Sequence, residues 1–258
     1  MPTRDTPWPA GTPCWVDYSA ADTTAARAFY ADLFGWEFAG GQPESGGYLT
    51  ALRGGRAVAG LMPRMSEQPP AWTTWFATDD ARATTRRAVE AGATVVAEPV
   101  AVTDLGAAAV LLDPQGNTFA LWEADQFIGE QVFGEPGSVV WNEAAVADPA
   151  AAREFYGTLF GFRWTEIPDS GGYCTFAVDD RPVGGLGGLG PNVPPGWTTC
   201  FSVASTDDAV QRLESGGGKV LIPAADTPYG RFAVGTDCLL YTSPSPRDRT
   251  RSRMPSSA

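Results

Sequence analysis

The stretch that decides the fold is residues 22–35, DTTAARAFYADLFG. It opens on an aspartate, a typical N-cap residue, and closes on a glycine, a typical helix-ending residue, so it predicts one helix between the two. Phe29 and Tyr30 lie four residues before Leu33 and Phe34. This spacing places the four side chains on one face of the helix, which we expect to be buried.

The same stretch returns later in the chain, at residues 148–161, as DPAAAREFYGTLFG. Upstream of it, WVD at residues 15–17 recurs as WNE at residues 141–143, also 126 positions apart. Further along, the spacing of matching segments falls to 125 and then 124 positions. A period of this length is too long for a solenoid and indicates a tandem domain duplication with small loop deletions.

The repeat defines two expected domains, residues 11–127 and residues 138–240, joined where Gly and Pro interrupt the pattern. The second copy stops resembling the first after Asp237, so we expect the last strand of the second domain to be missing. Residues 241–258 contain four Arg and one Asp in a Ser/Pro-rich setting. A disordered interaction arm is one interpretation of this tail. We favour a non-native origin, because it resembles translated sequencing-adapter read-through, and assign it no function.

Each domain divides into two similar modules, in which a strand and a helix precede two or three further strands. Alternating and apolar runs bounded by turn residues indicate these elements. In the first domain the strands are expected at residues 14–19, 48–53, 56–62, 72–77, 94–97, 107–112 and 118–122. Four such modules predict a mixed α+β chain.

Charge and composition limit the classes of partner. The 258 residues include 30 acidic and 18 basic ones, giving a net charge of −12, which argues against a nucleic acid or an anionic membrane as partner. The N-terminus has no apolar segment typical of a secretory signal, and no apolar run is long enough to span a membrane. We therefore expect a cytoplasmic protein. As its oligomeric state we expect a monomer or a homodimer.

Histidine is absent from the sequence, which removes whole classes of catalytic site. Ser-His-Asp and Cys-His catalysis, His-ligated zinc and the two-His-one-carboxylate iron site all require imidazole. The four cysteines are scattered without a C-x-x-C pair, which favours free thiols over a zinc knuckle or a disulfide framework.

The Asp-capped F-Y-x-x-L-F-G helices, together with DPQGN at residues 113–117, resemble the vicinal oxygen chelate superfamily. This is the glyoxalase, bleomycin-resistance and extradiol-dioxygenase group. The resemblance covers residues 11–237. Within the superfamily, the chain most resembles the two-domain actinobacterial members. It implies two tandem domains, each a pair of βαβββ modules forming a curled, cup-like sheet with helices outside.

In the enzymes of this superfamily, each cup holds one divalent metal through His, Glu or Gln. The resemblance places the ligand positions on the first strand of each module and on the last strand. They fall at Trp15, Trp72 or Thr73, and Ala120 in the first copy, and at Trp141, Trp197 or Thr198 in the second. Neither indole nor methyl ligates such an ion. The nearby acids are Asp17, Glu123 and Glu143. About one acid per copy provides too few oxygen ligands for a divalent ion. We therefore expect no cofactor, with a divalent metal as the alternative.

Aromatic residues on the expected strands suggest a ligand-binding cup instead. Trp15 and Asp17 share one face of a strand because side chains alternate, and Trp141 and Glu143 repeat the pair. An indole beside an acid is poor core and suits a flat aromatic or cationic organic ligand. The full candidate set is Trp15, Asp17, Tyr48, Trp75, Trp122, Trp141, Glu143 and Tyr173. The alternative is that these aromatics pack the core, which we favour for Trp75 and Trp122.

Two other patterns have structural explanations. The glycine-rich residues 184–190 lack the context of a phosphate-binding loop and predict a flexible loop between strands. The pairs Asp79-Asp80 and Asp207-Asp208 stand just before expected helices, where we interpret them as caps.

Three functions remain open. The leading hypothesis is metal-free binding or sequestration of a small aromatic or cationic molecule, in the manner of the bleomycin-resistance proteins. The second is a divalent-metal-dependent lyase or dioxygenase that uses carboxylates. The third is a non-catalytic protein-interaction module whose cups are filled by side chains.

Overall fold

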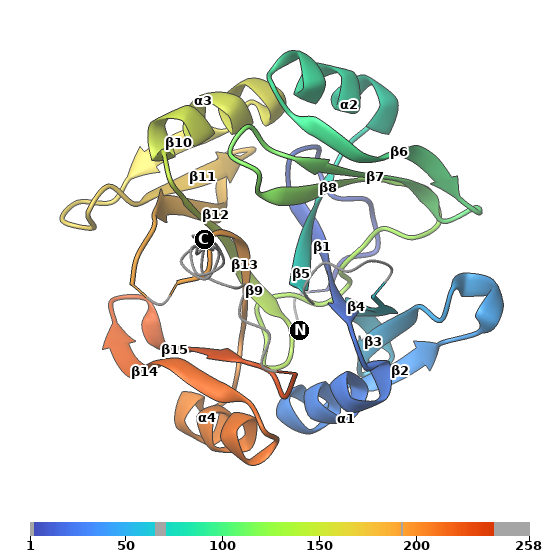
Figure 1. The fold of residues 1–258 in the computed structure, drawn as a ribbon, viewed down its shortest axis with the longest axis vertical. Helices are drawn as coiled ribbons and strands as arrows, with labels where there is room; N and C mark the ends of the chain where they lie inside the picture. Colours follow the sequence, from blue (N-terminus) through green and yellow to red (C-terminus); the bar gives the residue numbers. More distant parts are fainter. Residues whose placement is uncertain (1–2, 65–70, 192, 240–258) are drawn as a thin grey trace, which may run out of the picture.

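The first domain is a single eight-stranded sheet built from two modules (Figure 1). The computed structural model describes residues 3–64, 71–191 and 193–239, so the tail at 241–258 lies outside the described residues. The first domain contains β1 (Pro13–Ala20), α1 (Thr23–Phe34), β2 (Glu37–Gly40), β3 (Leu49–Arg53), β4 (Arg56–Pro63), β5 (Ala71–Ala77), α2 (Ala81–Glu90), β6 (Thr94–Val102), β7 (Gly106–Leu112) and β8 (Thr118–Ala124). The strand order is β2-β3-β4-β1-β5-β8-β7-β6.

The second domain repeats this order but its sheet is divided. It contains β9 (Val139–Val146), α3 (Pro149–Phe160), β10 (Arg163–Glu166), β11 (Cys174–Val178), β12 (Arg181–Gly188), β13 (Gly196–Phe201), α4 (Thr206–Ser215), β14 (Lys219–Thr227) and β15 (Gly230–Thr236). Five strands pair as β10-β11-β12-β9-β13, and β14 pairs with β15 separately. In the first domain β8 lies between β5 and β7, whereas no described strand joins the equivalent β13 and β15.

The two repeated helices begin and end where the sequence predicts. Asp22 accepts hydrogen bonds from the first-turn amides of α1, and Asp148 does the same for α3. Gly35 and Gly161 end these helices with φ of 68° and 72°, a left-handed conformation that favours glycine.

The helices of the other two modules are capped differently from each other. Of the expected pair Asp79 and Asp80, Asp80 is the N-cap of α2. For α4 the capping expectation is wrong in detail, because Ser205 is the N-cap, and Asp207 and Asp208 lie in the first turn. There their charge still favours the positive end of the helix dipole.

The glycine-rich segment, residues 184–190, is also different from the flexible loop that we expected. Gly184, Gly185, Gly187 and Gly188 lie inside β12 and pair with β9 or β11, so the segment is largely strand and not a loop. Packing explains the glycines, because a Cβ at Gly184 would lie 2.2 Å from the Phe176 ring. The short strands β2 and β10 that follow α1 and α3 were not expected either.

The hydrophobic core crosses the domain boundary. One buried cluster joins Phe76 and Phe119 of the first domain to Tyr156 and Trp197 of the second. Figure 1 shows the helices at the periphery, with α2 beside α3 and α1 beside α4. Each pair therefore brings one helix from each domain together. None of the described helices combines the length and apolarity that a membrane span requires.

Candidate functional site

In the first domain, β1 divides its side chains between two environments. Val16 and Tyr18 point toward α1 and join its core cluster. Trp15 and Asp17 therefore point to the opposite face, as alternation predicts. We call the face that carries Trp15, Asp17, Tyr48, Trp75 and Trp122 the first cup.

A hydrogen-bonded chain links three of the expected residues in the first cup. The Trp15 indole Nε1 donates to the Tyr48 hydroxyl at 2.8 Å, and this hydroxyl donates to Asp17 Oδ2 at 3.4 Å. Tyr48 reaches them because Gly60 on the neighbouring strand has no side chain. A Cβ at Gly60 would lie 1.9 Å from the Tyr48 hydroxyl oxygen and 2.7 Å from the Asp17 Cβ.

Asp17 is a buried acid, with 3% of its surface exposed. Burial raises its pKa from 3.8 to about 6, and the polar hydrogens of Trp75 and Tyr48 limit the rise. Burial also raises the pKa of the Tyr48 hydroxyl, and the charge of Asp17 adds to this effect.

Aromatic side chains close the first cup. Trp15 is 4% exposed and Trp122 8%, and both pack edge-on against Phe127, with the Trp15 ring centroid 4.9 Å from that of Phe127. The Trp122 indole donates to the Phe127 carbonyl at 2.7 Å, and Trp75 packs against Trp122. The interdomain segment that follows β8 therefore covers these aromatics, and the first cup contains mainly core packing.

The second domain repeats the hydrogen-bonded chain, with a shorter contact between the tyrosine and the acid. Trp141 Nε1 donates to the Tyr173 hydroxyl at 2.9 Å, and this hydroxyl donates to Glu143 Oε2 at 2.9 Å. Gly185 leaves the space, since a Cβ there would lie 1.8 Å from the Tyr173 hydroxyl oxygen. Unlike their counterparts Trp15 and Asp17, both Trp141 and Glu143 are partly exposed; Tyr173 is partly exposed, and so is its counterpart Tyr48. We call the face formed by these three residues the second cup.

Cys200 belongs to the second cup and was missed in the sequence. It pairs with Trp141 across β9 and β13, at the position that Trp75 occupies opposite Trp15. Burial and the charge of Glu143 raise the pKa of the Cys200 thiol to about 12, so the thiol is neutral at ordinary pH. The 125-residue spacing between Trp75 and Cys200 was the available signal.

The expected metal-ligand positions do not converge on an ion-binding donor set. Trp72 and Trp197 point into the core, where they donate to the hydroxyls of Tyr30 and Tyr156. Glu123 accepts a hydrogen bond from the first amide of α2 and so acts at a helix end. Each cup contains one carboxylate, which already accepts a hydrogen bond from a tyrosine hydroxyl.

A divalent cation requires several converging oxygen or nitrogen donors. Within residues 3–64, 71–191 and 193–239, no three Cys, Asp or Glu side chains gather as metal ligands. The donor chemistry of the cups therefore does not fit the metal centre that the fold family implies.

Comparison with known proteins agrees with this architecture. Residues 15–122 match the glyoxalase-like domain family, and residues 138–238 match the glyoxalase/bleomycin resistance protein/dioxygenase superfamily. The putative glyoxylase CFP32 of Mycobacterium tuberculosis is 34% identical over 247 residues, covering 92% of this chain and 94% of that protein. This chain belongs to the glyoxalase/bleomycin resistance protein/dioxygenase superfamily.

A second relative in the superfamily carries a biosynthetic name. The anthracycline biosynthesis protein DnrV of Streptomyces peucetius is 37% identical over 242 residues, covering 86% of this chain and 88% of that protein. Both relatives match across both domains, so the tandem arrangement is shared.

Solved structures of the superfamily share the fold at low identity. A Mn(II)-bound glyoxalase from Novosphingobium aromaticivorans has a TM-score of 0.60 at 19% identity, covering 90% of this chain and 84% of that chain. A 2,2',3-trihydroxybiphenyl 1,2-dioxygenase from Sphingomonas wittichii has a TM-score of 0.59 at 17% identity, covering 88% and 90%. These similarities establish the superfamily fold.

Proposed function

We propose that this protein binds a small organic molecule without a metal, and that the ligand occupies the second cup. The observation that carries the proposal is the partial exposure of Trp141 and Glu143, whose counterparts Trp15 and Asp17 are buried. The same hydrogen-bonded chain thus serves as internal packing in the first domain and remains accessible in the second.

The second cup offers both flat and charged surfaces. The hydrogen bond to Tyr173 fixes the Trp141 ring, so little side-chain freedom is lost when a ligand stacks on it. Glu143 uses Oε2 for Tyr173, which leaves Oε1 for a ligand donor. An indole face beside a carboxylate favours an aromatic ligand with a positive charge.

The names of the relatives agree with such a ligand. DnrV and DauV are both named as anthracycline biosynthesis proteins. Anthracyclines have planar fused rings, the shape that an exposed indole binds. The donor set at the cups argues against the metal-dependent lyase or dioxygenase alternative.

Binding to the full-length protein tests the proposal. Calorimetric titration with daunorubicin, a planar anthracycline with a charged amino sugar, and with its uncharged aglycone gives two dissociation constants. We expect Trp141→Ala to weaken both by about tenfold, since base-like stacking on an aromatic contributes roughly 1–3 kcal/mol. Glu143→Gln is expected to weaken only the cationic compound.

Two controls complete the test. Val140→Ala changes an exposed neighbour of Trp141 and is expected to leave binding unchanged. Thermal melts with manganese, nickel, zinc and ferrous iron test the metal alternative, because an ion at a hundred times its dissociation constant adds about 2.7 kcal/mol. A shift with one ion, or binding that survives Trp141→Ala, contradicts the proposal. Failure of every organic ligand favours the interaction-module alternative.

A further inference from the structure

A cavity separate from both cups lies where the two domains meet. It has a volume of about 190 Å³ and lies between the end of α1 and the start of α4. Leu33, Phe34, Pro136 and Val203 provide apolar surface, and the charged side chains in its wall include Arg53 and Arg212. Both domains therefore contribute to it.

Arg53 forms a hydrogen bond at the edge of this cavity. Its Nη1 donates to the Gly35 carbonyl at 3.3 Å. Gly35, which has a positive φ, leaves room for the guanidinium, since a Cβ there would lie 2.8 Å from Arg53 Nη1. The backbone at this glycine therefore accommodates the Arg53 guanidinium.

Arg212 approaches the same helix end from α4. Its Nη1 donates to the Asp32 carbonyl at 3.4 Å. Within the part of the chain that the structure describes, neither Arg53 nor Arg212 forms an ion pair with an acid. A guanidinium has five N–H donors, so each arginine keeps donors beyond the one that binds a carbonyl.

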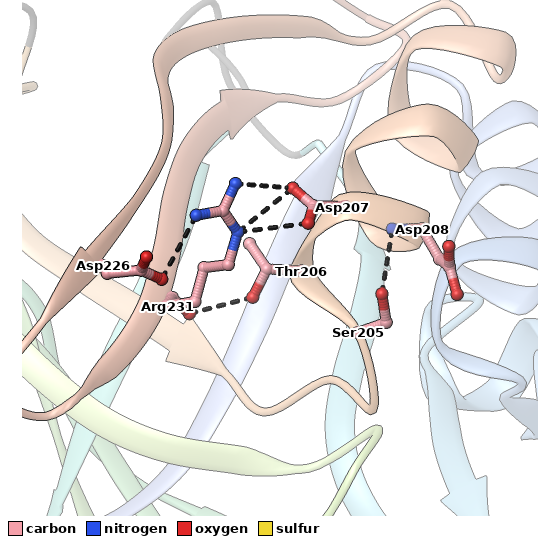
Figure 2. A network of polar contacts seen from close by, with 6 residues as sticks. All are labelled: Ser205, Thr206, Asp207, Asp208, Asp226 and Arg231. Atoms are coloured by element: carbon pink, nitrogen blue, oxygen red, sulfur yellow. Dashed lines mark hydrogen bonds and ion pairs between the residues drawn. The ribbon is translucent and has the colours of Figure 1, made fainter.

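Only one of the two acidic residues at the start of α4 opposes this charge. Figure 2 shows Asp207 turned toward Arg231, which binds it at 2.9 Å and also contacts Asp226. Asp208 lies on the other side of the helix start and lines the cavity. The residues that line the cavity therefore include two arginines and one aspartate.

We infer that this cavity binds a small organic carboxylate. Guanidinium groups bind carboxylates through paired, charge-assisted hydrogen bonds, and the wall of Leu33, Phe34 and Val203 suits an apolar body. The volume is below the roughly 300 Å³ at which pockets for drug-sized ligands begin, so the ligand is no larger than a single ring with its acid group.

The second helix pair provides a matched control. Arg87 of α2 occupies the position equivalent to Arg212 of α4, 125 residues earlier. It donates within its own helix to Thr84 Oγ1 at 3.0 Å and does not line this cavity. Arg87→Gln removes the same charge from the protein without changing the proposed site.

The test is a titration of the ¹⁵N-labelled full-length protein with benzoate, followed by amide shifts in residues 204–209 and at Gly35. We expect saturable shifts with benzoate and none with benzylamine, which has the same ring and the opposite charge. Arg212→Gln and Arg53→Gln are each expected to weaken benzoate binding about tenfold, and Arg87→Gln to leave it unchanged. Asp208→Asn is expected to strengthen it.

Several results would overturn the inference. These are the absence of shifts with benzoate, equal binding of benzylamine, and an equal loss of affinity in Arg87→Gln and Arg212→Gln. Binding of inorganic phosphate but not benzoate would overturn the role of the apolar wall. Since Arg53 also contacts the end of α1, Arg212→Gln decides the result if Arg53→Gln does not fold.

Discussion

At the scale of single residues, the buried Asp17 carboxyl links the stability of the protein to pH. Its pKa rises from 3.8 in the unfolded chain to about 6 in the fold, so the folded state holds the proton more tightly. The contribution of Asp17 to stability is therefore greatest at low pH and is lost as the pH rises from about 4 to about 6.

The variant Asp17→Asn does not titrate and removes this loss. We expect the free energy of unfolding of the variant, relative to the natural protein, to increase by about 1 kcal/mol between about pH 5 and about pH 8. Urea unfolding at the two pH values measures the difference. Glu98→Gln, at an exposed position, serves as the control. A relative stability that is the same at both pH values would show that Asp17 does not titrate as described.

Only part of each cup is predictable at the scale of single residues. Strand alternation correctly placed Trp15 beside Asp17 and Trp141 beside Glu143. It did not predict that Tyr48 and Tyr173 bridge these pairs, because the bridge crosses strands and depends on Gly60 and Gly185. Whether the candidate set binds a ligand stays a prediction.

At the scale of elements, β13 and β15 each keep an edge that no described strand pairs. In the first domain the corresponding edges of β5 and β7 both pair with β8. Unpaired edges expose backbone donors and acceptors and reduce the stability of a sheet. That the second domain lacks its last strand stays a prediction.

Grafting the last strand of the first domain onto the second tests this prediction. Replacing the residues after Asp237 with the sequence of residues 114–124 is expected to join the two sheets and raise the free energy of unfolding by a few kcal/mol, at roughly 0.5–1.5 kcal/mol per hydrogen bond. Hydrogen exchange of the β13 and β15 amides is expected to slow. A Gly/Ser graft of equal length is the control. Equal exchange in the two grafts would contradict the assignment.

At the scale of the whole molecule, the two domains share their cores. Phe76 of β5 is fully buried, stacks on Phe160 of α3 at 5.0 Å and meets Trp197 of β13 edge-on at 4.9 Å. Neither domain can lose this contact without exposing apolar surface of the other. We therefore expect the two domains to unfold in one transition.

Phe76→Ala tests this coupling. The substitution is expected to cost about 3–5 kcal/mol and to lower the stability of both domains together. Hydrogen exchange of β1 and β9 amides reports on each domain separately. Phe232→Ala, at a position with 44% exposure, is expected to cost less than about 1 kcal/mol. Loss of protection in β1 alone would indicate independent domains.

The sequence by itself determined the tandem repeat, the mixed α+β class and the caps of α1 and α3, because these depend on local spacing and on side-chain periodicity; the superfamily fold followed from the resemblance of these motifs. Tertiary structure decided which cup is accessible, since Phe127 packs on Trp15 through contacts distant in sequence. It also decided that the glycine-rich segment is a strand, because the ring of Phe176 requires the space. The cavity between α1 and α4 likewise exists only where helices of the two domains meet.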